Sequence, residues 1–175
     1  MILTRDVILA LLDSGSMAIE PFNDAALESA SYNVTLHNQI RVFMEGLNEI
    51  DVATVAENVN AIVDITRVVD MNVDGYYLLK PGELVLGMTE EKIRLPSDVA
   101  GWIQGRSRFA RMGLMVHITA SFMQPGSSNK LVYEIYNASR NAIKLRSGIP
   151  IAQVIFERCE GSAEYAGSFK NQEKI

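Results

Sequence analysis

The chain has 175 residues, of which 48% are hydrophobic and 21% charged, a composition typical of one soluble globular domain. Its net charge of −5 and its lack of a basic stripe argue against nucleic acid as a partner. No apolar run approaches the roughly 20 residues that span a bilayer, so no membrane partner is expected. The single cysteine, Cys159, permits no internal disulfide, and we predict a cytoplasmic protein.

The first predicted element is a short helix over residues 4–14. Thr4 is the expected N-cap, and Gly15 is the residue at which the helix should end. The apolar face of this helix consists of Val7, Ile8, Leu11 and Leu12.

Short apolar runs separated by turns make up most of the remaining chain. The predicted strands lie at 32–36, 40–42, 62–69, 76–79, 83–88, 99–104, 114–120, 131–136, 142–145 and 151–157. Turn pairs such as Pro81-Gly82 and Pro125-Gly126 separate them. Many short strands with frequent turns predict a mainly β fold, a sandwich or barrel. Residues 45–62 fit either a helix or a long loop.

No linker or repeat divides the chain, so residues 1–160 are predicted to form one domain. Residues 161–175 lose the periodicity of the preceding strands. We expect this C-terminal segment to be mobile unless a ligand orders it.

The stretch 101–137 carries the strongest functional signal. It places Arg106, Arg108 and Arg111 within six positions, next to a Gly-Arg-Ser turn. Guanidinium groups and backbone N–H groups both suit phosphate oxygens, so this pattern predicts a polyanionic ligand. The alternative is that the three arginines form a solvated surface.

Glu134 lies within an apolar strand, where a carboxylate is costly unless it is paired or used in chemistry. With only His37, His117 and one cysteine, the zinc-deaminase signature is absent, and so are the common phosphate-loop motifs. Hydrolytic chemistry here would need a general base without protein-bound zinc, and Glu134 is the candidate. The alternatives are that Glu134 is a paired edge carboxylate and that His117 is a satisfied core residue.

The order of these motifs resembles the deoxycytidine triphosphate deaminase branch of the trimeric dUTPase superfamily. The resemblance extends from Ala30 to Glu157. It rests on SASYNVTL at 29–36, LLKPGELVLGMTEEKIRLP at 78–96, GRSRFARMGLMVHITASFMQPG at 105–126, KLVYEIYN at 130–137 and AIKLRSGIPIAQVIFE at 142–157. It implies a distorted β-barrel or jelly roll of the dUTPase-like type, a homotrimer with active sites between subunits, and a tail (161–175) that closes as a lid over bound nucleotide.

Carried over by position, the resemblance implies a catalytic set and a substrate-binding set. Glu134 becomes the general base and acid, while Ser107 and Arg111 orient the water and the carboxylate. The implied substrate contacts are Arg106 and Arg108 at the phosphates, Thr119 and Ala120 at the cytosine amino group, Val132 and Tyr133 along the base and sugar, and Tyr165, Lys170 and Gln172 in the tail.

Several positions depart from the family pattern. Gln124 stands where the family has an aspartate that contacts the deoxyribose, Arg108 replaces a serine, and Asn33 replaces an aspartate. Ser168-Phe169 stands in place of a Lys-Tyr pair, and the charge of Arg108 is expected to compensate for the missing tail lysine.

The implied reaction is deamination of dCTP to dUTP by water, with a Glu134 pKa raised by partial desolvation. Magnesium would arrive with the triphosphate, and no protein metal ligand is expected. The alternatives are a dUTP diphosphatase, a bifunctional enzyme that releases dUMP, and a non-catalytic nucleotide-binding trimer.

Overall fold

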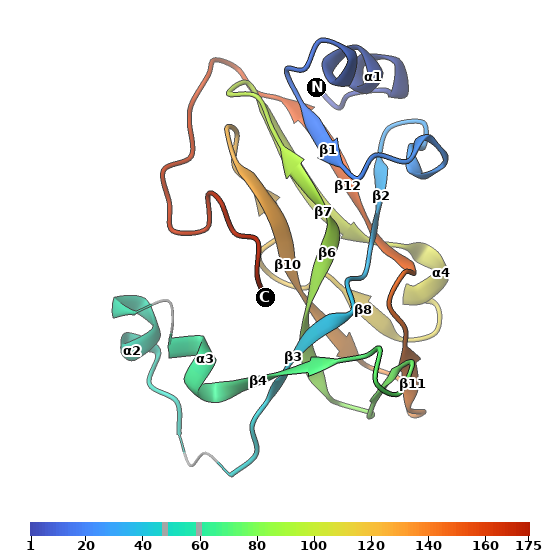
Figure 1. Ribbon diagram of the computed structural model, residues 1–175, viewed down its shortest axis with the longest axis vertical. Helices are drawn as coiled ribbons and strands as arrows, with labels where there is room; N and C mark the ends of the chain where they lie inside the picture. Colours follow the sequence, from blue (N-terminus) through green and yellow to red (C-terminus); the bar gives the residue numbers. More distant parts are fainter. Residues whose placement is uncertain (47–48, 59–60) are drawn as a thin grey trace.

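The computed structural model describes residues 1–46, 49–58 and 61–175. The described strands form three open sheets rather than a closed barrel, and the class is the predicted one, mainly β with a short N-terminal helix (Figure 1). Of the segment 45–62, the structure describes one short helix, α2 (Val52–Glu57). Residues 47–48 and 59–60 of that segment lie outside the described residues.

Helix α1 (Arg5–Asp13) forms where it was predicted, and Gly15 with a φ of +68° follows its end. The prediction that the Thr4 side chain caps this helix is wrong. Thr4 occupies the N-cap position but accepts no backbone N–H; its hydroxyl instead donates to the Asp6 carboxylate. Ile8 is fully buried, so the helix is held by its apolar face rather than by its cap.

The largest sheet has the strand order β4-β3-β6-β10-β8, with β1 pairing to β6. Its pairs are antiparallel. Its strands are β1 (Ala18–Glu20), β3 (Gln39–Phe43), β4 (Thr66–Asp70), β6 (Leu84–Arg94), β8 (Leu114–Val116) and β10 (Ser128–Asn137).

A four-stranded sheet, in the order β2-β12-β7-β9, makes up the second layer, and β11 pairs with β5 in a small third sheet. The strands of these sheets are β2 (Tyr32–Thr35), β5 (Tyr77–Leu79), β7 (Val99–Gly105), β9 (Phe122–Met123), β11 (Ile143–Leu145) and β12 (Pro150–Arg158). Three short helical segments complete the described elements, namely η1 (Asp24–Ala26), α3 (Ile62–Ile65) and α4 (Ser107–Ala110).

Strand β10 shows how the alternating sequence builds the core. Leu131, Tyr133 and Ile135 are buried, while Val132 and Glu134 between them are only partly covered. Successive side chains of a strand point to opposite faces, so this register sends Glu134 away from the core. The strand therefore presents a carboxylate on its outer face.

Two predicted strands differ from the structure. Of residues 62–69, the first four form helix α3, and the Thr66 hydroxyl donates to the Ile62 carbonyl at 2.6 Å where the chain turns into β4. Of residues 114–120, only Leu114–Val116 form a strand. Residues 117–120 leave the sheet because Ile118 and Thr119 turn toward Glu134, and Ile118 is 40% exposed.

The C-terminal tail lies beside the first residues of β10 (Figure 1). The backbone N–H groups of Ser128 and Lys130 donate to the carbonyls of Lys170 and Gln172 at 3.0 and 2.8 Å. A step of two residues along β10 matches a step of two residues in the same direction along the tail, as in a parallel pair of strands. The structure gives one position of the tail, and its mobility stays a prediction.

No helix within the described ranges is long and apolar enough to cross a membrane.

Candidate active site

Glu134 is the centre of a small polar cluster on β10. Its side chain is 19% exposed, and in the register of the sheet it lies opposite Leu86 of β6. The Thr119 hydroxyl donates to Oε1 at 2.5 Å, and the backbone N–H of Ile118 donates to Oε2 at 3.3 Å. The loop after β8 thus holds both carboxylate oxygens in place.

His117 joins this cluster from the same loop. Its side chain is 2% exposed, and Nδ1 lies against the Glu134 carboxylate. The same nitrogen is 3.1 Å from the backbone nitrogen of Glu134. Nδ1 therefore lies between the side-chain carboxylate and the backbone nitrogen of Glu134. The sequence had favoured a satisfied core histidine, but its Nε2 has no partner among the described residues.

The prediction of a raised Glu134 pKa is wrong for this arrangement. Burial does raise the pKa of this carboxyl, but the hydrogen bond from Thr119, the backbone N–H groups and the His117 ring lower it by more. The net pKa lies below the ordinary value of a glutamate. Glu134 is therefore ionised at neutral pH, which is the state that accepts a proton.

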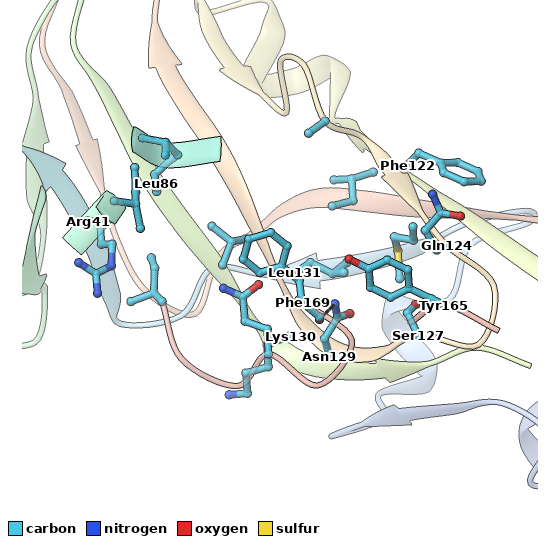
Figure 2. Close-up of a pocket in the computed structure, with 18 residues that line it drawn as sticks. Arg41, Leu86, Phe122, Gln124, Ser127, Asn129, Lys130, Leu131, Tyr165 and Phe169 are labelled. Carbon is cyan, nitrogen blue, oxygen red and sulfur yellow. Dashed lines mark hydrogen bonds between the residues drawn. The ribbon is translucent and has the colours of Figure 1, made fainter. Parts of the chain in front are cut away.

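A cavity of about 580 Å³ is lined by Ala120, which follows Thr119, and by Leu86, which lies opposite Glu134 in the sheet; Figure 2 shows the residues that line it. Five of the predicted site residues line it: Ala120, Gln124, Val132, Tyr165 and Gln172. Arg41 and Leu86 lie at one end, and Phe122 and Gln124 at the other (Figure 2). The wall is mostly apolar, with a few polar groups, which is typical of a site for a small molecule.

The tail forms one wall of this cavity, through Tyr165, Phe169, Gln172 and Ile175. Phe122 also lines the cavity, and its ring packs against Trp102, with ring centroids 4.8 Å apart. The Trp102 indole N–H donates to Glu157 Oε2 at 3.0 Å, which fixes the ring. An aromatic pair therefore supports the cavity from outside.

A second cavity, of about 480 Å³, is lined by Arg106 and Arg108, which were predicted at the phosphates, and by Ser107, which was predicted to orient the water. Arg106 Nη1 donates to the Pro150 carbonyl at 2.9 Å. Burial, and then the charge of Arg108, lower the pKa of Arg106, with Glu28 opposing them. Two guanidinium groups that repel each other in one cavity favour an anion between them.

Five predicted site residues line neither cavity: Glu134 and Thr119 belong to the cluster described above, and Tyr133, Arg111 and Lys170 lie elsewhere. The prediction is corrected for the side chain of Tyr133, which is 1% exposed in the core and whose hydroxyl donates to the Met88 carbonyl at 3.2 Å, so this side chain reaches neither cavity. Arg111 is exposed at the end of α4. Lys170 pairs with Glu164 at 3.2 Å.

Sequence reasoning missed Ser127 and Asn129, which line the first cavity, because only a structure reveals their unpaired atoms. Within the described ranges, no group of three or more His, Cys, Asp or Glu residues is arranged to hold a metal ion.

A family model described as dCTP deaminase-like matches residues 2–159. The dCTP deaminase of Shewanella amazonensis is 40% identical over 164 residues, 91% of this chain and 84% of that protein. A relative from Nocardioides sp., named "dCTP deaminase, dUMP-forming", is 35% identical over 179 residues, 98% of this chain and 91% of that protein.

The crystal structure of 2′-deoxycytidine 5′-triphosphate deaminase from Agrobacterium tumefaciens aligns with 90% of this chain at a TM-score of 0.65 and 20% identity. This chain spans 48% of the length of that protein. The alignment confirms the predicted fold. With the match of the family model over residues 2–159, it follows that the chain belongs to the dCTP deaminase-like family.

Proposed function

We propose that this protein deaminates dCTP to dUTP and ammonia. The observation that supports this most directly is Glu134, an ionised carboxylate held by Thr119 and Ile118 beside a cavity of nucleoside size. The relatives named dCTP deaminase, which match most of this chain, support the same substrate.

The chemistry requires one group that both accepts and donates protons. As water attacks C4 of cytosine, Glu134 takes a proton from it and delivers the proton to ring nitrogen N3. Glu134 then takes the proton of the new hydroxyl and passes it to the amino group. The C4–N bond breaks, ammonia leaves, and the C4 carbonyl of uracil remains. Thr119 and Ile118 keep the carboxylate oriented through both transfers.

We also propose that the active protein is a homotrimer. Arg106, Ser107 and Arg108 line one cavity, and Ala120 and Gln124 line the other, with no described residue lining both. A nucleoside triphosphate needs base and phosphate contacts at once. We call the first cavity, lined by Ala120 and Gln124, the base cavity, and the second, lined by Arg106 and Arg108, the arginine cavity. The arginine cavity of a neighbouring copy would complete the base cavity. Arg111 would then reach the site from that copy.

The substrate would enter as the magnesium complex of the triphosphate, because Mg²⁺ binds phosphate oxygens in preference to an all-protein cage. The tail would close over it as a lid, with Tyr165, Lys170 and Gln172 on its inner side. A chain with one cysteine fits the reducing cytoplasm, where we place this reaction.

A second candidate is the bifunctional reaction that continues to dUMP and pyrophosphate. The Nocardioides relative, named as dUMP-forming, favours it. The two reactions are separated by incubating the purified protein with dCTP and with dUTP and measuring ammonia and pyrophosphate independently. Ammonia without pyrophosphate supports the deaminase, both products support the bifunctional enzyme, and neither product contradicts both. Light scattering of the same sample measures the molar mass and so tests the trimer. A monomer with full activity would exclude the trimer as the active form.

A further inference from the structure

The base cavity contains two buried polar atoms that lack any partner among the described residues, Ser127 Oγ and Asn129 Oδ1. Buried polar atoms in native proteins are nearly always hydrogen-bonded. Leaving one unpaired destabilises the protein, so such an atom at a cavity wall indicates a partner that the protein alone does not supply.

Ser127 is held by its backbone and not by its side chain. It ends the turn Gln124-Pro125-Gly126-Ser127, in which the Ser127 N–H donates to the Gln124 carbonyl at 3.3 Å and Gly126 has a φ of +72°. The Ser127 carbonyl accepts from the Leu95 N–H at 2.9 Å. With both backbone groups satisfied and the residue 3% exposed, the side-chain hydroxyl is the one polar group of Ser127 without a partner among the described residues.

Asn129 uses its two amide atoms differently. Nδ2 donates to the Phe169 carbonyl of the tail at 2.8 Å, while Oδ1 is buried and unpaired. Because the amide nitrogen donates to the tail, Oδ1 is left as a buried acceptor without a partner among the described residues. Figure 2 shows Asn129 close to Phe169 and Ser127.

We propose that Ser127 and Asn129 bind the nucleoside through its hydrogen-bond donors, and that Asn129 couples the filled cavity to the position of the tail. The inference rests on the proposed function, since the ligand is a cytosine nucleotide. A ligand donor bonded to Oδ1 holds the amide in the orientation in which Nδ2 reaches the tail. The donor is either a sugar hydroxyl or the cytosine amino group, the two kinds of donor that a deoxycytidine carries.

The first test compares Ser127→Ala with the wild type by calorimetric titration with dCTP and by thermal unfolding without ligand. We expect affinity to fall by about three- to tenfold, roughly the value of one neutral hydrogen bond. We expect the ligand-free melting temperature to stay equal or rise, because an unpaired buried hydroxyl has been removed. Unchanged affinity for dCTP overturns the role of Ser127, whatever the melting temperature.

The second test follows trypsin cleavage after Lys170, which releases residues 171–175. In the wild type, dCTP should slow this cleavage at least severalfold. Asn129→Ala should lose most of the protection and also bind dCTP more weakly. Asn129→Asp keeps an acceptor but lacks the donor to the tail, so it should lose the protection. Asn141→Ala, at an exposed position outside both cavities and away from the cleaved bond, is the matched control and should behave as the wild type. Full protection of Asn129→Ala by dCTP overturns the coupling.

The 2′,3′-dideoxy analogue of dCTP distinguishes the two donors. Equal binding of this analogue by the wild type and Ser127→Ala assigns the sugar hydroxyl to Ser127. A wild type that still binds it more tightly than the variant assigns the amino group. Binding and cleavage require no turnover, so ammonia release in the same samples tests the proposed function separately. A wild type that binds dCTP, with variants that bind and protect equally, overturns this inference alone.

Discussion

Replacing Thr119 with valine removes the hydroxyl that donates to Glu134 Oε1 and keeps the shape of the side chain. A hydrogen bond to a charged group is worth about 1.5–3 kcal/mol, and the lower end applies here because Thr119 is exposed. We therefore expect the free energy of unfolding at pH 7 to fall by about 1.5 kcal/mol, measured by urea denaturation. Thr119→Ser, which retains the hydroxyl, is the control.

The pH dependence gives the decisive measurement. The pKa of Glu134 is lowered in the folded protein, so the stabilisation from its partners is present above the ordinary glutamate pKa and is lost as the pH falls through the folded value. Without the Thr119 hydroxyl, the folded pKa rises. The acid limb of the ammonia-release profile should therefore move to higher pH in Thr119→Val and stay in place in Thr119→Ser. Coincident acid limbs for Thr119→Val and the wild type would refute the assignment of Glu134 as the titrating base.

Three further predictions follow from the same site. Glu134→Gln keeps the shape but not the proton acceptor, so ammonia release should be abolished while calorimetry still detects dCTP binding; near wild-type release would remove Glu134 from the mechanism. Truncation after Ala163 removes one wall of the base cavity, so KM should rise sharply or kcat should fall. Circular dichroism and light scattering should be unchanged, because the fold and the oligomer remain. Unchanged kinetics would exclude the lid. Arg108→Ser should weaken triphosphate binding roughly tenfold, because one charge-assisted contact is lost. Arg140→Ser, at an exposed position outside both cavities, should leave the affinity unchanged. Equal affinities of the two variants would exclude Arg108 from the phosphate site.

The apolar run at 131–136 was enough to predict the strand. The outward position of Glu134 was not predicted, and it follows from the alternation of buried and partly covered side chains along β10. The same alternation places Tyr133 in the core, which the family resemblance alone did not reveal. Residues 117–120 misled the prediction because His-Ile-Thr-Ala continues the strand-like run from Leu114 and alternates polar with apolar residues. The bonds that draw them out of the sheet come from Glu134, more than a dozen residues further along the chain.

Long-range contacts also explain what was missed in α3 and in the tail. Ile62–Ile65 is rich in β-branched residues, yet it is helical, and its last carbonyl accepts from the distant Met44 N–H at 2.9 Å, a contact that local propensity does not reveal. The tail has no periodic pattern, and its position depends on the N–H groups of Ser128 and Lys130, which no property of the tail sequence predicts. Unpaired atoms such as Ser127 Oγ arise from the packing of several segments at once.

The aromatic pair behind the base cavity gives the protein an internal optical reporter. Trp102 is the only tryptophan of the chain, so indole emission comes from a single place. Its ring touches Phe122, which lines the cavity, and its N–H is bonded to the Glu157 carboxylate, a group able to influence the emission. A nucleotide that shifts Phe122 changes the surroundings of the indole directly. Titration of the native protein, without any label, should then follow the filling of the cavity in real time, including in variants that no longer turn over.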